Sequence, residues 1–119
     1  IYPQGIYDLL MKLAAYGEIR EIMVTENGAA FADTVASDRV ADNYRIEYFK
    51  GYIAEVLRAK RAGANVTGYF AWSLLDNFEW AEGYAPRFGL VHVDYETQKR
   101  TIKDSGYWYR DFISGLRRR

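Results

Sequence analysis

Cysteine is absent from this sequence of 119 residues, and histidine occurs once, at His92. The lack of cysteine excludes disulfides, thiolate metal sites and cysteine nucleophiles, and it fits a reducing compartment. A single histidine excludes a metal site built from several histidines of this chain. We therefore expect no bound metal and no cofactor.

Neither sign of charge dominates, because sixteen basic residues balance sixteen acidic ones. This balance gives no reason to expect nucleic acid or an anionic membrane as a partner. No apolar run approaches the roughly 20 residues that cross a bilayer. The basic cluster at 117–119 is interpreted as the solvated end of a helix.

The first residues, IYPQGIYDLL, contain no initiator Met, no charged leader and no cleavage site. We therefore expect no signal peptide, and we expect the chain to be a piece of a longer protein or a processed product. A cytoplasmic location is expected from the missing cysteines.

Aromatic residues are abundant instead, at 17% of the sequence, and half of all residues are apolar. This composition is typical of a folded domain. Apolar residues at helical spacing predict three helices, over 2–17, 38–62 and 104–116. Short apolar runs predict two buried strands, over 22–25 and 65–74.

Glycine and capping residues predict where the helices begin and end. Gly17 and Gly63 are expected to end the first two helices, and Ser37 or Asp38 to cap the start of the second. The segment 26–37 is predicted to be a loop that turns at Asn27 and Gly28. A strand–helix–strand order implies parallel strands, hence an α/β fold.

The long helix has an apolar stripe that is predicted to pack in the core. Its apolar members recur mostly every four residues. They are Val40, Tyr44, Tyr48, Phe49, Tyr52, Ile53, Val56 and Leu57. Arg45 is expected off this stripe.

The last third of the chain is predicted to hold a long aromatic loop and a hairpin. The loop covers 74–88, and the two short strands lie within 89–103. His92 is expected on a face of this hairpin, and Asp94 is expected to pair with Arg100 across it.

Polar and aromatic side chains follow the predicted ends of both buried strands. Glu26 comes directly after the first strand. The second strand and the loop after it provide Trp72, Asp76, Asn77, Glu79, Trp80 and Glu82. Because the carboxyl ends of parallel strands meet at one edge, we expect these groups on a common rim.

Carboxylates beside indoles are typical of carbohydrate sites. The apolar face of a sugar ring stacks on an aromatic ring, and its hydroxyls need acceptors and donors such as Glu79 and Trp80. A glycosidase also needs a carboxylate that attacks the anomeric carbon or stabilises its positive charge. Glu26 is the candidate for that role.

Two segments carry a specific resemblance to a known family. VTENG at 24–28 and GYFAWSLLDNFEWAEGYAPRFGLVHVDYETQKRTIKDSGYWY at 68–109 closely resemble the C-terminal part of glycoside hydrolase family 1, and IYPQGIYDLL resembles the family's Tyr-Pro-x-Gly segment. The family consists of retaining β-glucosidases and their relatives, which are (β/α)8 TIM barrels. The resemblance implies that 1–119 is the C-terminal quarter of one such catalytic domain, with strands seven and eight, their helices and a short hairpin.

The resemblance also implies a role for each matching residue. Glu26 corresponds to the nucleophile, and Trp72 to the platform under the sugar. Glu79 corresponds to the carboxylate that holds the 4- and 6-hydroxyls, Trp80 to the indole beside it, and Phe88 to an aromatic wall. Because Glu79 keeps the acid, we expect a β-glucoside or a related neutral saccharide as substrate, hydrolysed with retention. Family habit again suggests the cytoplasm.

One catalytic group of the family has no counterpart here. Its acid/base glutamate stands in an Asn-Glu-Pro tripeptide, which this sequence lacks, since its only prolines are Pro3 and Pro86. Glu82 and Asp76 are the possible substitutes, but both belong to the sugar-binding loop. The N-terminal remainder of the barrel, in the same or a separate chain, is therefore an expected partner.

Three interpretations stay open on the sequence. The first is an enzyme fragment that supplies the nucleophile of a β-glucosidase. The second is a non-catalytic sugar-binding module that uses Trp72, Glu79 and Trp80. The third is a structural or folding fragment that binds nothing alone.

Overall fold

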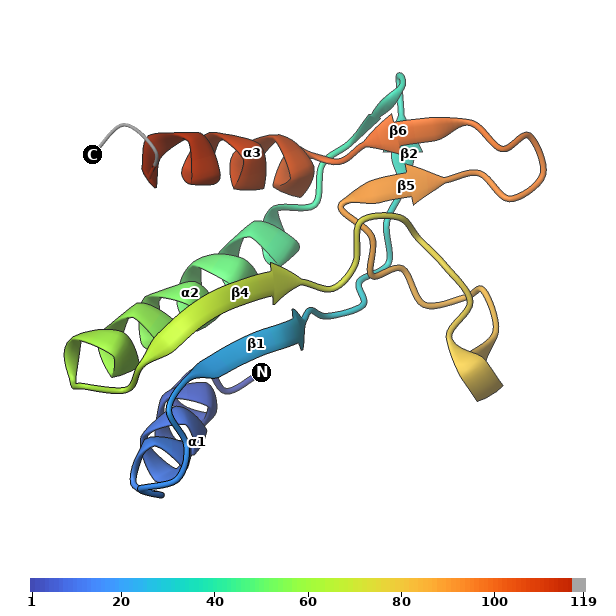
Figure 1. Cartoon of the computed structure of the whole chain (residues 1–119). Helices are drawn as coiled ribbons and strands as arrows, with labels where there is room; N and C mark the ends of the chain where they lie inside the picture. The colour runs from blue at the N-terminus through green and yellow to red at the C-terminus, as the bar shows by residue number, and fades with distance from the viewer. Residues whose placement is uncertain (117–119) are drawn as a thin grey trace. The chain divides into compact units, whose positions relative to one another are not determined.

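The computed structural model describes residues 1–116, so the arginine cluster 117–119 and its interpretation lie outside the described residues. Figure 1 shows the elements along this part of the chain. They are α1 (Gln4–Ala14), β1 (Ile22–Asn27), β2 (Val35–Ala36), β3 (Arg39–Val40), α2 (Asn43–Arg61), β4 (Val66–Ala71), the 3-10 helix η1 (Trp80–Glu82), β5 (Val91–Val93), β6 (Arg100–Ile102) and α3 (Asp104–Leu116).

The chain divides into two compact units. Unit 1 contains Ile1–Asn27 and Glu47–Ala71, and unit 2 contains Gly28–Ile46 and the chain from Trp72 onward. Unit 1 thus holds α1, β1, β4 and most of α2, whereas unit 2 holds the small hairpins, η1 and α3.

Unit 1 is built on a parallel pair of strands. β1 pairs with β4 in a register that sets Ile22 opposite Val66 and Asn27 opposite Ala71. Figure 1 shows α2 running alongside this pair. The core cluster joins both helices to β4 through Leu10, Val56, Ala59, Ala64 and Val66. The predicted α/β class and the parallel strands are confirmed.

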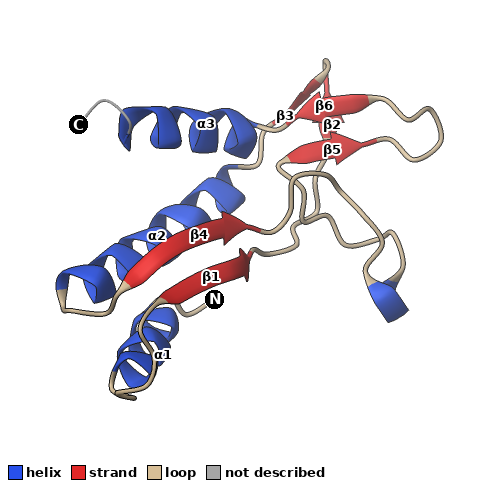
Figure 2. Ribbon diagram, in the orientation of Figure 1, coloured by secondary structure: helices blue, strands red, loops and turns tan. Residues whose placement is uncertain are grey.

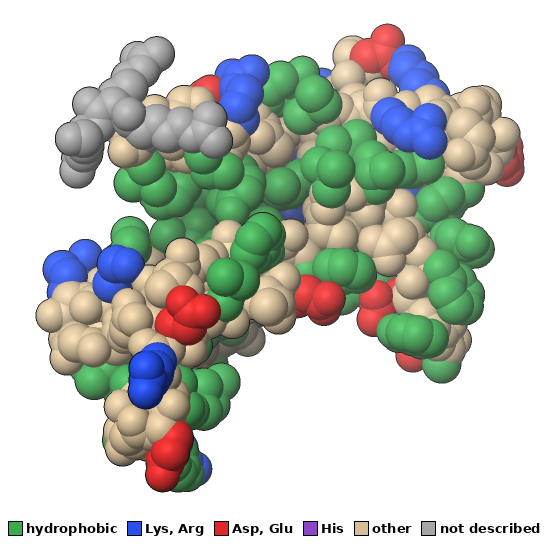
Figure 3. Space-filling view, in the orientation of Figure 1, with side chains coloured by type: hydrophobic (Ala, Val, Ile, Leu, Met, Phe, Trp, Pro, Cys, Tyr) green, Lys and Arg blue, Asp and Glu red, His purple; other side chains and the backbone are tan. Residues whose placement is uncertain are grey.

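The two strands are not buried as the sequence predicted. Met23 on β1 is 49% exposed and Phe70 on β4 is 56% exposed. A pair of strands has two open edges and few neighbours to cover its faces. Large hydrophobic side chains consequently lie on the surface, many of them on the face drawn in Figure 3.

The buried face of α2 differs from the predicted stripe. Phe49, Ile53 and Val56 are buried, but Tyr44 is 80% exposed and Leu57 is 36% exposed. Each four-residue step overshoots one helical turn by about 40°. A stripe that repeats every four residues therefore moves away from the core, and Tyr44 lies about 120° around the helix from Val56.

Several predicted helix boundaries are wrong. Ser37 and Asp38 do not cap α2 but form the turn between β2 and β3, where both have positive φ. The first turn of α2 instead begins at Asp42, whose backbone carbonyl accepts the Arg45 N–H. α1 ends at Ala14, three residues before Gly17. Gly63 does follow the end of α2 as predicted, with a φ of 107°.

Unit 2 contains two antiparallel hairpins and a helix. The β5–β6 hairpin sets His92 opposite Thr101, and α3 spans the predicted residues, so both predictions are confirmed. The β2–β3 hairpin lies in a segment predicted to be a loop, because strands of two residues leave no alternating pattern. Asp94 does not pair with Arg100; it accepts the backbone N–H groups of Glu96 and Thr97.

Candidate functional site

Glu26 is the next-to-last residue of β1, and its side chain is exposed. It lines a groove of unit 1 together with Tyr2 and Tyr52. The neighbouring Asn27 accepts a hydrogen bond of 2.7 Å from the Tyr69 hydroxyl. An exposed carboxylate in an open groove can act as a nucleophile toward a ligand.

Aromatic hydroxyls in the same unit lie close to this strand end. Burial raises the pKa of Tyr48 to about 12, and a hydrogen bond with Asn27 partly offsets this effect. Tyr48 also stacks on Tyr52, with ring centroids 4.3 Å apart. The polar end of β1 thus has the hydroxyls of Tyr69 and Tyr48 beside Asn27.

Gly28 makes a close approach that the sequence could not specify. A Cβ built on this glycine would lie 1.8 Å from the carbonyl oxygen of Trp72, so no other residue fits without moving the backbone. Asn27 is the last residue of β1 and no turn begins at Gly28, so the predicted turn at these two residues is absent. The peptide bond after Trp72 is cis.

The glycone loop, as we call residues 77–88, carries three of the predicted sugar-binding residues. Figure 2 shows that the segment between β4 and β5 is loop apart from η1. The Glu79 N–H donates to the Gly83 carbonyl at 2.7 Å, and Trp80 is 82% exposed. Phe88 is half-buried, and its carbonyl accepts the Ser73 N–H at 3.3 Å.

Unit 2 therefore holds four of the five predicted site residues. Trp72 and Phe88 come from adjacent segments, because Ser73 and Phe88 are hydrogen-bonded, while Glu79 and Trp80 lie near the tip of the glycone loop. Glu26 belongs to unit 1. The common rim of all five stays a prediction.

The sequence disfavoured Asp76 as a substitute acid, and its surroundings in the structure agree. Its side chain is fully buried and accepts hydrogen bonds from Lys103 at 2.8 Å and from Arg87 at 3.1 Å. It also accepts the backbone N–H groups of Gly89 and Val93. A carboxylate with this many internal donors is a structural anchor.

Asp76 belongs to a larger set that we call the charge network. It contains three carboxylates and three cations of unit 2, and its members in the described residues are Asp33, Asp42, Asp76, Arg45, Arg87 and Lys103. All of their side chains are at most 2% exposed except that of Arg87, which is 22% exposed. Sequence reasoning missed this network. The sequence contained one indication of it: Arg45 lies four residues before Phe49 and eight before Ile53, and both of these are buried.

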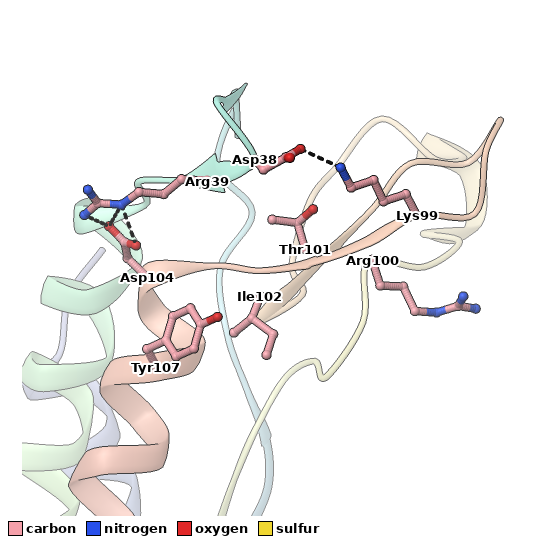
Figure 4. Close-up of a pocket in the computed structure, with 8 residues that line it drawn as sticks. All are labelled: Asp38, Arg39, Lys99, Arg100, Thr101, Ile102, Asp104 and Tyr107. Carbon is pink, nitrogen blue, oxygen red and sulfur yellow. Dashed lines mark hydrogen bonds and ion pairs between the residues drawn. The ribbon is translucent and has the colours of Figure 1, made fainter.

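A surface pocket of unit 2 is lined by none of the predicted sugar-binding residues. Figure 4 shows Arg39 facing Asp104 and Lys99 facing Asp38 at its rim. Arg100 also lines this pocket, and among the described residues it donates to the Gln98 carbonyl and has no carboxylate partner.

Across residues 1–116, no helix combines the length and the apolar character needed to cross a membrane. The same part of the chain contains no cluster of His, Cys, Asp and Glu side chains that could hold a metal ion.

Comparison with known proteins gives consistent results. The family model described as "Glycosyl hydrolase family 1" matches residues 1–117. β-Glucosidase A of Thermotoga maritima is 54% identical over 114 residues, which are 95% of this chain and 26% of that protein. A 6-phospho-β-galactosidase of Streptococcus equi subsp. zooepidemicus is 50% identical over 115 residues, which are 96% of this chain and 24% of that protein.

A solved structure supports the same relationship. The family 1 β-glucosidase of Thermotoga maritima in complex with isofagomine lactam matches 96% of this chain with a TM-score of 0.93 and 54% identity. The match covers 26% of the solved chain. This chain thus spans about a quarter of the length of the relatives it matches.

Proposed function

This chain belongs to glycosyl hydrolase family 1, and we propose that it forms the nucleophile-bearing part of a retaining β-glucosidase. The observation that carries the proposal is the extent of the match, which runs through 95% of the chain at 54% identity to a β-glucosidase. The match includes both the VTENG segment and the tryptophan-rich block. The proposed reaction is hydrolysis of terminal β-D-glucosidic bonds.

The chain is proposed to supply the last two strands of a (β/α)8 barrel. In this assignment β1 is strand seven and β4 is strand eight, with α2 between them. Their parallel pairing supports the assignment, because neighbouring strands of such a barrel are parallel. The rest of the barrel would come from another part of the same protein or from a separate chain. A cytoplasmic location remains a prediction.

The proposed mechanism assigns one role to each site residue. The ionised Glu26 carboxylate attacks the anomeric carbon, the bond to the leaving oxygen breaks, and a glycosyl-enzyme ester forms. Water then hydrolyses this ester with overall retention. The acid that protonates the leaving oxygen must come from outside this chain.

Four residues of unit 2 are proposed to hold the sugar. Trp72 stacks under the ring, and Phe88 forms a wall of the subsite. Glu79 accepts hydrogen bonds from the 4- and 6-hydroxyls, and the Trp80 indole donates to the 3-hydroxyl. A carboxylate at residue 79 would repel a 6-phosphate, so unphosphorylated sugars are the proposed substrates even though 6-phospho-β-galactosidases are among the relatives.

The test uses a chimera in which this chain replaces the matching quarter of Thermotoga maritima β-glucosidase A. We expect the chimera to hydrolyse 4-nitrophenyl β-glucoside faster than its 6-phosphate. Glu26→Gln should lower kcat by several orders of magnitude, because an amide cannot form the glycosyl ester. A 2-fluoroglucoside should label Glu26, as intact-mass and peptide mass spectrometry would detect.

The matched control is Glu96→Gln, the same chemical change at an exposed residue of the β5–β6 turn. It should keep the activity of the unmodified chimera. Labelling at a residue other than Glu26, or an active Glu26→Gln variant, would refute the assignment of the nucleophile.

A further inference from the structure

We propose that the charge network positions the glycone loop for sugar binding, with Asp76 as its central positioning residue. This inference rests on the proposed function, because the loop carries Glu79, Trp80 and Phe88. It assigns a task to buried charges that touch neither the sugar nor the reacting atoms.

The tip of the glycone loop is held mainly by its own backbone. Glu82 N–H bonds to the Glu79 carbonyl at 2.9 Å, and Gly83 N–H bonds to the Trp80 carbonyl at 3.1 Å. On the hairpin side, Tyr84 packs on Tyr95 with ring centroids 4.7 Å apart. A tip of this kind keeps its shape, but its placement depends on the base of the loop.

Asp76 joins the two sides of that base. It stands immediately before the loop, and its Oδ1 accepts the N–H of Gly89, immediately after the loop, at 2.9 Å. Its Oδ2 accepts from Arg87 Nη1 at 3.1 Å. That same Nη1 donates to the Val93 carbonyl at 2.7 Å. One carboxylate thereby holds the two ends of the glycone loop together.

The network extends from this base to the segment that follows β1. Lys103 links Asp76 to Asp33, and Arg45 binds Asp33 through two hydrogen bonds of 3.0 Å each. Arg45 also donates to the Arg87 carbonyl at 2.6 Å. The same carbonyl accepts the Phe31 N–H. The segment that follows the proposed nucleophile strand is therefore bonded to the base of the glycone loop through the charge network.

Stability alone is a weak reason for these charges. Removing several ions from water is costly, and well-packed apolar side chains often stabilise a core as well or better. Ion pairs and hydrogen bonds differ from apolar contacts because they impose direction on their partners. A network that bonds to five backbone groups of unit 2 determines loop geometry, which a sugar site requires.

The decisive experiment compares two substrates in the chimera described above. Asp76→Asn keeps the size of the side chain but removes the charge that Lys103 and Arg87 face. A glucoside has a 6-hydroxyl for Glu79 to hold, whereas a xyloside lacks the C6 hydroxymethyl group that carries it. We expect kcat/KM to fall about 30-fold for the glucoside and only about threefold for the xyloside. The difference between the two losses, about tenfold, is the effect expected for one displaced charge-assisted hydrogen bond. A purely structural role would lower both by the same factor.

A double variant provides a second readout. If Asp76 acts through Glu79, the combined Asp76→Asn and Glu79→Gln losses on glucoside should be clearly smaller than the product of the single losses. If Asp76→Asn does not fold, Arg87→Gln tests the same base at a partly exposed residue. Arg39→Gln is the control, because its ion pair with Asp104 lies on the surface pocket and not at the loop base.

Failure of the positioning role and failure of the proposed function give different results. Equal losses on both substrates, or losses that multiply in the double variant, would overturn the positioning role while leaving the glycosidase function intact. An unmodified chimera that folds but hydrolyses no β-glycoside would refute the proposed function itself, and the positioning role with it.

Discussion

His92, on β5, is a residue whose protonation reports on the charge network. Burial lowers the pKa of its imidazole below the ordinary value of 6.5, and the positive charge of Arg87 lowers it further. Asp76 acts in the opposite direction, but its effect is smaller. Because His92 is the only histidine, isotope labelling of this chain alone gives the signals of a single imidazole ring.

We predict that Arg87→Gln raises the pKa of His92 toward its ordinary value, because it removes a nearby cation. NMR titration of the labelled chain, assembled with the remaining three quarters of the Thermotoga enzyme as a separate polypeptide, measures this shift. Arg39→Gln should leave the pKa unchanged. An unaltered pKa in Arg87→Gln would contradict the described packing of β5 near Arg87.

The sign of the linked stability effect follows from the same shift. Between pH 6.5 and the lowered pKa, the unfolded state binds more protons at His92 than the folded state does. The contribution of His92 to stability is therefore present above pH 6.5 and is lost as the pH falls through the folded pKa.

Among the elements, α2 contributes one narrow face to the core of unit 1. Val56 is 4% exposed and belongs to the core cluster, whereas the adjacent Leu57 is 36% exposed. Helical geometry separates neighbouring residues by about 100°, so one enters the core and the other does not.

We predict that Val56→Ala lowers the free energy of unfolding by about 2 kcal/mol, because it removes buried methyl groups and leaves a cavity. Leu57→Ala should cost less than about 1 kcal/mol, although it removes more atoms. Urea unfolding of the chimera measures both values. A larger loss for Leu57→Ala would mean that Leu57 is buried, as the predicted stripe had it, and not half-exposed as the structure describes it.

The elements were predictable to different degrees. Residues 104–116, 91–93 and 100–102 have strong local patterns, and the structure places α3, β5 and β6 there. The start of α2 was not predictable, because Ser37 and Asp38 are good cap residues that a tight turn uses instead. The β2–β3 hairpin is too short to leave a pattern.

On the scale of the whole molecule, this chain is proposed to be incomplete as a catalyst. A retaining glycosidase needs two carboxyl groups about 5–5.5 Å apart. The sequence has no Asn-Glu-Pro tripeptide to supply the second one. The exposed apolar side chains of both units agree with surfaces that another part of a barrel covers.

We predict that the 119-residue chain alone has no more than trace β-glucosidase activity. Adding the remaining three quarters of the Thermotoga enzyme as a separate polypeptide should restore turnover, because it supplies the acid/base and covers the open strand edges. Activity measured against increasing amounts of the added segment should saturate. Full turnover by the pure chain would contradict the incomplete-barrel model.

The sequence by itself determined the α/β class, the parallel strands and the family, because these depend on local periodicity and on short motifs such as VTENG. Residue chemistry also pointed to Trp72, Glu79 and Trp80 as candidate sugar residues, and the family resemblance added Phe88. Only the tertiary structure decided that Asp76 is an anchor, that Arg45 is buried and that Gly28 must lack a side chain. Each of these depends on contacts with residues far along the chain, and such contacts leave no local pattern in the sequence.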